Sequence, residues 1–192
     1  PSLPIKSVKD LIAMAKAKPG ELNYASTGTG STTHLATELF KAMAGVAIVH
    51  VPYKGTGATV VALVGGEVPL LFGSPPPLTP HLKAGRLRAL AITTAEPSAL
   101  APGLPTVAAS GLPGYQATGI TAVFAPARTP TAIINRLNDE MVRFLNRPEV
   151  KETFFSRGSE AVPSTPEQLA AAVELDMART GKLIKDLGLR KD

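Results

Sequence analysis

The chain has 192 residues, of which 44% are apolar, and a formal net charge of +5. This length and apolar fraction are sufficient for a folded core in one or two domains. The sequence contains no cysteine, which excludes disulfides and thiolate metal sites, and its basic residues are scattered, which argues against a nucleic-acid-binding surface.

The first half of the sequence predicts alternating helices and strands. A helix begins after Ser7 and ends before Pro19, where Pro and Gly follow its apolar face. The further expected elements are helices at 31–44, 55–64 and 78–84 and strands at 22–26, 48–51, 68–72 and 87–93. Helices that alternate with strands over short connections indicate an α/β fold with a mostly parallel sheet between two layers of helices.

The second half begins with the segment 96–116, whose many prolines and glycines predict loops. The elements expected after it are a fifth strand at 120–125 and helices that begin at Pro130, Pro148 and Pro166. The last of these helices has a capping-box pattern, in which Thr165 is followed three residues later by Gln168. No apolar stretch approaches the length that spans a bilayer, and no signal-peptide pattern is present in the chain.

A loop rich in Gly, Ser and Thr joins the strand at 22–26 to the helix at 31–44. Its residues are Ser26, Thr27, Gly28, Thr29, Gly30, Ser31 and Thr32. A helix start has unpaired backbone N–H groups and the positive end of the helix dipole, so this loop predicts an anion site. The alternative is a tight turn in which the glycines serve only backbone geometry. The loop lacks the glycine spacing of a dinucleotide fingerprint and the lysine of a P-loop, which argues against a nucleotide ligand.

Polar residues also follow the next two strands. Tyr53, Lys54 and Gly55 come after the strand at 48–51, and Ser74 comes after the strand at 68–72. Ligands of open α/β sheets bind beyond the carboxyl ends of the strands, so we expect these residues to converge with the loop on one crevice. Tyr53 at the edge of the core and Lys54 as an ordinary surface cation are equally compatible with the sequence.

No pattern in the sequence indicates catalysis or a cofactor. The Gly-x-Ser-x-Gly motif of a nucleophile elbow does not occur. His34, His50 and His81 lack the spacing of metal ligands, and His34 is expected to be a hydrogen-bonded structural residue. The acidic pairs near the C-terminus are expected on solvated helix faces. The sequence therefore predicts a binding protein without catalytic residues, metal or cofactor.

Short motifs along nearly the whole chain resemble those of one family. They are NYASTGTGS at 23–31, HL at 34–35, HVPYKG at 50–55, AGRLRAL at 84–90, LPTV at 104–107, GLPGY at 111–115, and AP and TP at 125–126 and 129–130. In combination they resemble the Bug family, the periplasmic solute-binding receptors of tripartite tricarboxylate transporters.

The resemblance implies a two-lobed α/β receptor of the periplasmic-binding-protein (Venus-flytrap) type. In such a fold residues 1–126 correspond to the second, ligand-binding lobe, with a mostly parallel five-stranded sheet flanked by helices. Residues 127–192 correspond to a C-terminal helical return that packs partly on the first lobe. Family members hold small carboxylates between the lobes, so the loop 26–32, with Tyr53, Lys54, Gly55 and Ser74, is expected to form one side of the clamp.

The function that the resemblance implies is capture of a small carboxylate in the periplasm and its delivery to the membrane subunits of the transporter. The ligand classes are di- and tricarboxylates, acidic amino acids and aromatic acids, and no nucleic acid is involved. One alternative is a ligand-sensing module for a signalling partner. Another is a small α/β enzyme, which would need a nucleophile or general base with convergent partners, and the sequence presents none.

Two departures from the family pattern lead to further expectations. No residues match the glycine-rich loop of the first lobe, so the chain is expected to be a truncated form, with its signal peptide outside it, that binds carboxylate weakly or not at all. Apolar faces of the last helices would then be exposed, which predicts a homodimer or a repacked C-terminus. Pro69 removes a backbone donor from the third strand, which predicts an edge position or irregular geometry there.

Overall fold

The computed structural model describes residues 3–188, and these divide into two compact units, 3–119 and 120–188. The elements of the first unit are α1 (Val8–Ala17), β1 (Asn23–Ser26), α2 (Thr32–Ala44), β2 (Val49–Pro52), α3 (Thr56–Val64), β3 (Leu70–Leu71) and α4 (Pro75–Lys83). Those of the second unit are α5 (Thr131–Leu145), α6 (Pro148–Ser156) and α7 (Pro166–Asp186).

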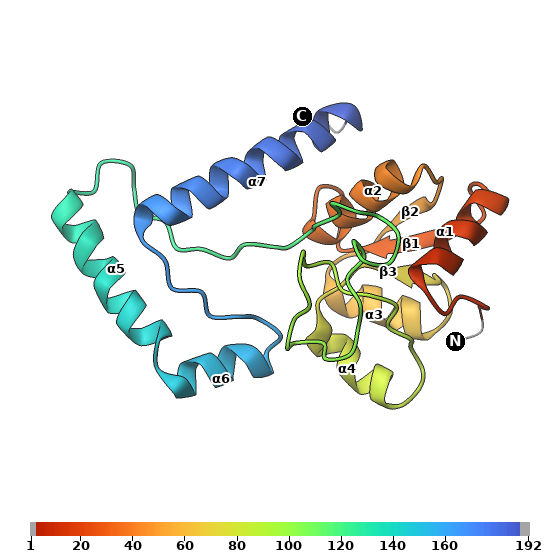
Figure 1. The fold of residues 1–192 in the computed structure, drawn as a ribbon, viewed down its shortest axis with the longest axis horizontal. Coiled ribbons are helices and arrows are strands. Elements are labelled where there is room, and N and C mark those ends of the chain that lie inside the picture. Colours follow the sequence, from red (N-terminus) through yellow and green to blue (C-terminus); the bar gives the residue numbers. More distant parts are fainter. Residues whose placement is uncertain (1–2, 189–192) are drawn as a thin grey trace. The chain divides into compact units, whose positions relative to one another are not determined.

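The sheet of the first unit is parallel, with strand order β2-β1-β3 (Figure 1). Successive side chains of the central strand β1 point to opposite faces. Tyr24 belongs to a buried apolar cluster with residues of α1 and α2, whereas Ala25 packs with Ala62 of α3 and with Val68. Helices therefore cover both faces of the sheet, and the expected α/β fold class is confirmed.

The sheet has three strands among residues 3–188, so the expectation of five strands is wrong. The segment 87–93 forms only an isolated bridge between Ile92 and Thr106, and the segment 120–125 is irregular. The third strand is reduced to two residues and lies at an edge of the sheet, directly after Pro69. Proline has no N–H group to donate, so the start of this strand offers little to a fourth strand.

The helices α1 and α7 begin at the capping signals that the sequence presents. Ser7 accepts a hydrogen bond from the amide of Asp10, and Thr165 and Gln168 form the reciprocal capping box that their spacing predicts. The helix α4 begins earlier than expected, at Pro75 rather than at residue 78. Prolines are tolerated in the first turn of a helix because the N–H groups there have no helical acceptor.

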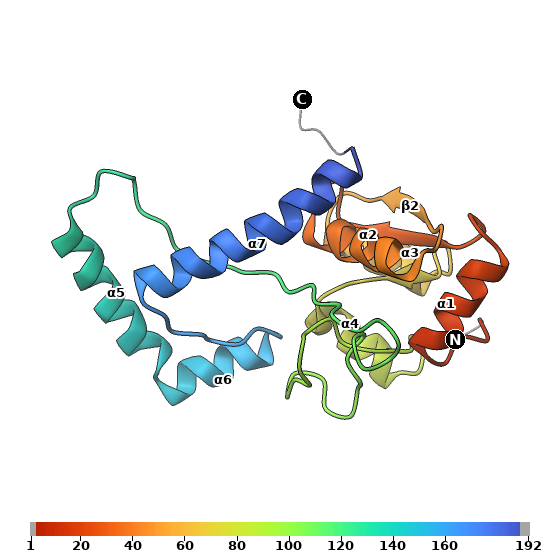
Figure 2. The same ribbon diagram turned by 45° about the horizontal axis from the view of Figure 1, so that its top comes forward.

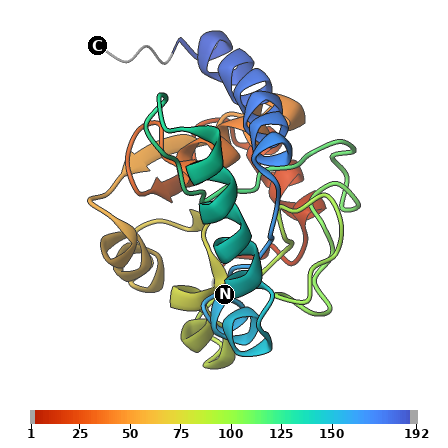
Figure 3. The ribbon, with the colours of Figure 1, turned by 90° about the vertical axis from the view of Figure 1, so that its left-hand side faces the viewer.

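The second unit consists of three helices and their connections (Figures 2 and 3). The helix α5 packs against both α6 and α7. Ile133, Leu137 and Phe144 share one face of α5, and each is about half exposed, at 50%, 50% and 49%. Within residues 3–188, no helix combines the length and the apolar character that a membrane crossing requires.

Candidate functional site

The parallel sheet brings the three strand ends to one edge, as the sequence predicts. Ser26 at the end of β1 pairs with Pro52 at the end of β2, and Ala25 pairs with Leu71 at the end of β3. Each strand is followed by the N-terminus of a helix, namely α2, α3 or α4. The carboxyl edge of the sheet therefore carries the loop 26–32 and the starts of three helices.

The loop 26–32 needs its glycines for backbone geometry. Gly28 and Gly30 have φ values of +127° and +76°, which L side chains rarely adopt. Ser31 then caps α2, because its Oγ accepts a hydrogen bond from the amide of His34 at 3.3 Å. The same hydroxyl donates to the carbonyl oxygen of Gly28 at 2.7 Å. The hydroxyl of Ser31 therefore links the N-cap of α2 to the turn at Gly28.

Four backbone amides of this loop are already bonded within the chain. Gly28 donates to Ser26 Oγ at 3.1 Å, and Gly30 donates to His34 Nδ1 at 3.1 Å. Thr27 donates to Thr33 Oγ1 at 3.0 Å, and Ser31 donates to the carbonyl oxygen of Gly28 at 3.2 Å. The amides of Thr29, Thr32 and Thr33 form no hydrogen bond with other residues of the described chain. Thr29 and Thr32 are also exposed. The donors that remain for an anion therefore lie at the tip of the loop and in the first turn of α2.

The segment after β2 lies next to this loop. The amide of Tyr53 donates to the carbonyl oxygen of Ser26 at 2.9 Å, which joins the two strand ends. The hydroxyl of Tyr53 donates to Glu67 at 2.8 Å. The pKa of the phenol is raised, mainly by burial and also by this hydrogen bond to the carboxylate. Lys54 is exposed, and Gly55, at φ +86°, precedes α3 without a side-chain cap.

Ser74 precedes α4 in the same manner. It has extended backbone geometry as the N-cap residue of α4, and its side chain does not cap the helix. The side chain is exposed. Its hydroxyl therefore lies at the helix start without the capping hydrogen bond that Ser31 makes at α2.

A buried polar cluster supports the loop, and sequence reasoning did not assign a role to most of its members. Tyr24 donates its hydroxyl to Glu38 at 2.6 Å, and Lys41 binds the same carboxylate oxygen. The rings of His34 and His50 are 4.1 Å apart, centroid to centroid. A usable signal was present in the sequence: His34 and Glu38 have the i, i+4 spacing of one helix face.

The electrostatics of the cluster follow from its burial. Burial raises the pKa of Tyr24 far above its usual value, and the bond to Glu38 acts in the same direction. Burial lowers the pKa of both His34 and His50; Lys41 also lowers these pKa values, whereas Glu38 raises them. The two imidazoles are therefore held in their neutral forms more strongly than exposed histidines. His34 forms a hydrogen bond, as expected for a structural histidine, and the structure also shows that it is buried.

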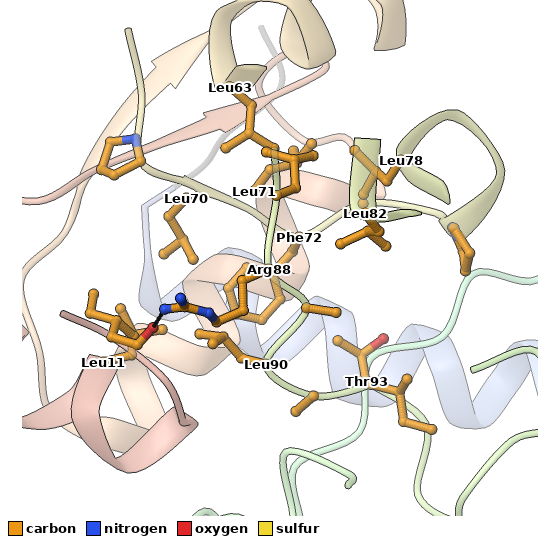
Figure 4. A pocket seen from close by; sticks show the side chains of 18 of the residues that line it. Leu11, Leu63, Leu70, Leu71, Phe72, Leu78, Leu82, Arg88, Leu90 and Thr93 are labelled. Atoms are coloured by element: carbon orange, nitrogen blue, oxygen red, sulfur yellow. Dashed lines mark hydrogen bonds between the residues drawn. The ribbon is translucent and has the colours of Figure 1, made fainter. Parts of the chain in front are cut away.

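A separate cavity of 490 Å³ lies elsewhere in the first unit, between β3, α4 and the segment 86–94 (Figure 4). Its wall is mainly apolar, and Leu70, Phe72 and Leu90 face it. Arg88 enters it and donates to the carbonyl oxygen of Ile5 at 2.7 Å. None of the residues expected at the ligand site lines this cavity. The cavity lies between β3 and the segment 87–93, which was expected to pair with β3 as a fourth strand but does not.

Metal coordination receives no support from the part of the chain that the structure describes. Residues 3–188 contain no group of three or more His, Asp or Glu side chains placed to hold a metal ion. What the carboxyl edge does offer is unpaired backbone amides, threonine hydroxyls and one exposed lysine. These groups suit an oxyanion.

Comparison with known sequences relates residues 1–189 to the family described as the tripartite tricarboxylate transporter family receptor. Protein BugT of Bordetella pertussis is 37% identical over 190 residues, which cover 99% of this chain and 58% of that protein. A protein from Pseudomonas sp. strain P51 is 35% identical over 185 residues, or 96% of this chain and 55% of the relative. The chain thus spans somewhat more than half the length of these two curated relatives.

Solved structures agree with this comparison. Rpa4515 of R. palustris, determined with adipate, superposes with a TM-score of 0.86 at 41% identity and covers 97% of this chain and 62% of the other. The periplasmic binding protein BugD gives a TM-score of 0.79 at 26% identity, over all of this chain and 64% of the other. MatC of Rhodopseudomonas palustris, with bound malate, gives 0.75 at 28% identity, over 94% of this chain and 63% of the other.

Proposed function

Because the chain belongs to the family of tripartite tricarboxylate transporter receptors, we propose that it binds a small carboxylate in the periplasm for delivery to transporter membrane subunits. The loop 26–32 is the part of the chain that takes the carboxylate. The observation that carries this proposal is the set of unpaired backbone amides at the loop and at the start of α2.

The chemistry of the loop fits a carboxylate. The amides of Thr32 and Thr33 lie in the first turn of α2, where the helix dipole favours negative charge. The amide of Thr29 adds a third donor from the loop tip. The hydrogen bonds of the loop's other amides fix the backbone before a ligand arrives, which lowers the entropic cost of binding.

The neighbouring segments supply charge and further donors at the same edge of the sheet. Lys54 is exposed and lies two residues after the end of β2, so its ammonium group adds a long-range attraction for an anion. The helix start at Gly55 adds further unpaired backbone donors. The helix α4 begins with three prolines, which have no N–H group, so Ser74 offers its exposed hydroxyl instead. We assign Lys54, Gly55 and Ser74 to the ligand site on this basis. Tyr53 contributes its backbone, since its hydroxyl is bonded to Glu67.

We assign the ligand to the dicarboxylates. Two of the similar structures were determined with adipate and with malate. Both molecules carry two carboxylates on a short aliphatic chain. The loop 26–32 would hold one of the two carboxylates.

Binding rather than hydrolysis is the better reading of the Ser26–His50 contact. Ser26 Oγ lies 2.6 Å from His50 Nε2, the distance of a nucleophile and its base. The side chain of Ser26 is nevertheless fully buried and is also bonded to the backbone of Gly28. A buried hydroxyl cannot reach a substrate carbonyl, so the contact has a structural role.

We further propose that the 192-residue chain alone binds its ligand weakly. It spans 58% of BugT and 62% of Rpa4515, and in two-lobed receptors the ligand is closed between two lobes. The first unit supplies the contacts of one lobe only. Calorimetry with adipate and malate is expected to show no tight complex, and a tight one-to-one complex would contradict this part of the proposal.

The decisive experiment follows backbone amides by NMR while the labelled chain is titrated with adipate or malate. The amides of Thr29, Thr32 and Thr33 are expected to shift, and the uncharged diamide of adipic acid is expected to leave them unchanged. Lys54→Gln is expected to reduce the amide shifts that the dicarboxylate causes. Lys83→Gln is the matched control, because Lys83 lies at the C-terminal end of α4, away from the helix start at Ser74. Shifts confined to other residues, or no shifts with either acid, would overturn the proposal.

A further inference from the structure

Two imidazoles connect the glycines of the ligand loop to the buried core. His34 Nδ1 accepts the amide of Gly30 at 3.1 Å. His50 Nε2 lies 2.6 Å from Ser26 Oγ, and this hydroxyl oxygen accepts the amide of Gly28 at 3.1 Å. The histidine pair, His34 and His50, therefore holds one glycine amide directly and the other through Ser26.

The hydrogen bond to Gly30 requires a neutral His34. A ring nitrogen that accepts a hydrogen bond carries no proton, so a proton on Nδ1 would face the N–H of Gly30 and break the bond. The two rings are 4.1 Å apart, so their titrations are coupled and a charge on one opposes a charge on the other. The state seen in the structure is therefore the state in which His34 is uncharged.

The surroundings of the pair give an imidazolium little compensation. On α2, Glu38 Oε1 lies 4.0 Å from His34 Nε2, but the same oxygen already receives Lys41 and the hydroxyl of Tyr24. On β1, the ring of Tyr24 stacks on His50 with centroids 5.0 Å apart. Burial lowers the pKa of both histidines.

From this geometry we propose that His34 and His50 are positioning residues that hold the ligand loop in its binding shape while they are neutral. The proposal rests on the carboxylate function proposed above. Protonation breaks the Gly30 bond, the loop rearranges, and carboxylate binding weakens as the pH falls. The chain would thus bind its ligand more weakly in an acidic periplasm than in a neutral one.

The first test needs no ligand. The amide of Gly30 and the ring nitrogens of both histidines are followed by NMR as the pH is lowered. We expect the amide signal of Gly30 to change with the protonation of the pair, and the Nδ1 signal of His34 to be that of an unprotonated acceptor at neutral pH. A Gly30 amide that does not respond to protonation of the pair would overturn the proposal.

Variants then separate positioning from general stability. In His34→Asn the side-chain oxygen takes the place of Nδ1 as an acceptor that does not titrate, whereas His34→Leu removes the acceptor. We expect His34→Asn to bind adipate with a pH dependence clearly smaller than that of the unmodified chain, and His34→Leu to bind weakly at every pH. His81→Asn, on α4, is the control. Titration of the ligand itself affects all variants equally.

The outcomes distinguish the two proposals. If the chain binds carboxylates with the same pH dependence in His34→Asn as in the unmodified chain, the positioning role fails and the carboxylate function stands. If the amide signal of Gly30 changes with protonation of the histidine pair but no carboxylate binds at any pH, the carboxylate function fails and the loop-positioning role stands. If His34→Leu does not fold, the ligand-free titration and the pH dependence of binding by His34→Asn still test the positioning role.

Discussion

Tyr24 and His50 are register partners on the neighbouring parallel strands β1 and β2, and their rings stack with centroids 5.0 Å apart. Tyr24 donates its hydroxyl to Glu38 on α2, so one side chain joins the sheet, the histidine and the helix. The ligand loop connects the same strand and helix. The stability of this cluster and the shape of the loop are therefore coupled.

Removing the Tyr24 hydroxyl should destabilise the first unit. Tyr24→Phe takes a hydrogen bond from a buried carboxylate, and bonds to charged groups contribute about 1.5–3 kcal/mol. Tyr53→Phe is the matched control, because it removes a phenol–carboxylate bond that is exposed. Urea denaturation should show a clearly larger loss of unfolding free energy for Tyr24→Phe. Equal losses for the two variants would show that the buried Tyr24–Glu38 hydrogen bond contributes no more to stability than the exposed Tyr53–Glu67 bond.

The glycines of the loop should not tolerate a side chain. Gly28→Ala places a Cβ on a residue with φ +127°, which is strained although no neighbouring atom lies within 4 Å. Gly57→Ala, inside α3, also has open space and gains helix propensity of about 0.5–1 kcal/mol. The two substitutions should therefore shift the thermal midpoint in opposite directions. A stabilising Gly28→Ala would be inconsistent with the described backbone.

Ser31 should matter for the loop as well as for the helix. Ser31→Ala removes the cap of α2, at a cost of about 1 kcal/mol, and the bond to the carbonyl oxygen of Gly28. Ser7→Ala removes the cap of α1, which is not connected to the loop. Both variants should lose similar stability in denaturant titrations, but only Ser31→Ala should alter the amide shifts of the loop. Unchanged loop shifts in Ser31→Ala would contradict the link between cap and turn.

Stability should fall as the pH drops below the ordinary range of histidine. The pKa values of His34 and His50 are lower in the folded chain than their usual 6.5. Between the lowered pKa of the folded chain and the usual value of 6.5, the unfolded chain binds more protons than the folded chain. The unfolding free energy therefore rises with pH in this range, and the contribution of the two histidines to stability is complete above pH 6.5.

Urea midpoints measured between about pH 5 and 8 should show this slope, and the double variant His34→Asn with His50→Asn should flatten it. Asp10 and Glu167 also have lowered pKa values, but their ordinary values of 3.8 and 4.5 place their effects below this window. A slope that persists in the double variant would assign it to other groups.

The exposed face of α5 should promote self-association. Ile133, Leu137 and Phe144 are each about half exposed on this face, and apolar patches of this kind associate in water. Leu137→Lys should lower the average mass measured by light scattering at high protein concentration, while Arg136→Gln on the same helix should not. A monomeric unmodified chain at the same concentration would remove the reason for the prediction.

The local features of this chain were predictable from short stretches of sequence. The capping box at Thr165 and Gln168 and the start of α1 after Ser7 depend on residues three positions apart, so their geometry does not need the rest of the fold. The start of α6 at Pro148 was expected for a similar reason. The edge position of β3 was expected because Pro69 lacks a backbone donor.

The strand expected at 87–93 was predicted wrongly because its apolar pattern does not report on its partner. A strand forms only when a neighbour offers a matching row of donors and acceptors, and β3 provides only two paired residues. The segment instead lies across a cavity from β3, and a single bridge joins it to Thr106. Pairing of this kind depends on contacts between distant parts of the chain.

The α/β class, the capping box of α7 and the place of the Gly/Ser/Thr loop between β1 and α2 could be predicted from residues that are neighbours in the sequence. Which amides of that loop are free and which are bonded depends on the folded arrangement of the loop, α2 and the sheet. His34 and His50 are sixteen residues apart and meet only because β2 pairs with β1 beneath α2. Their contact depends on the packing of a helix on a sheet, which no short stretch of sequence specifies.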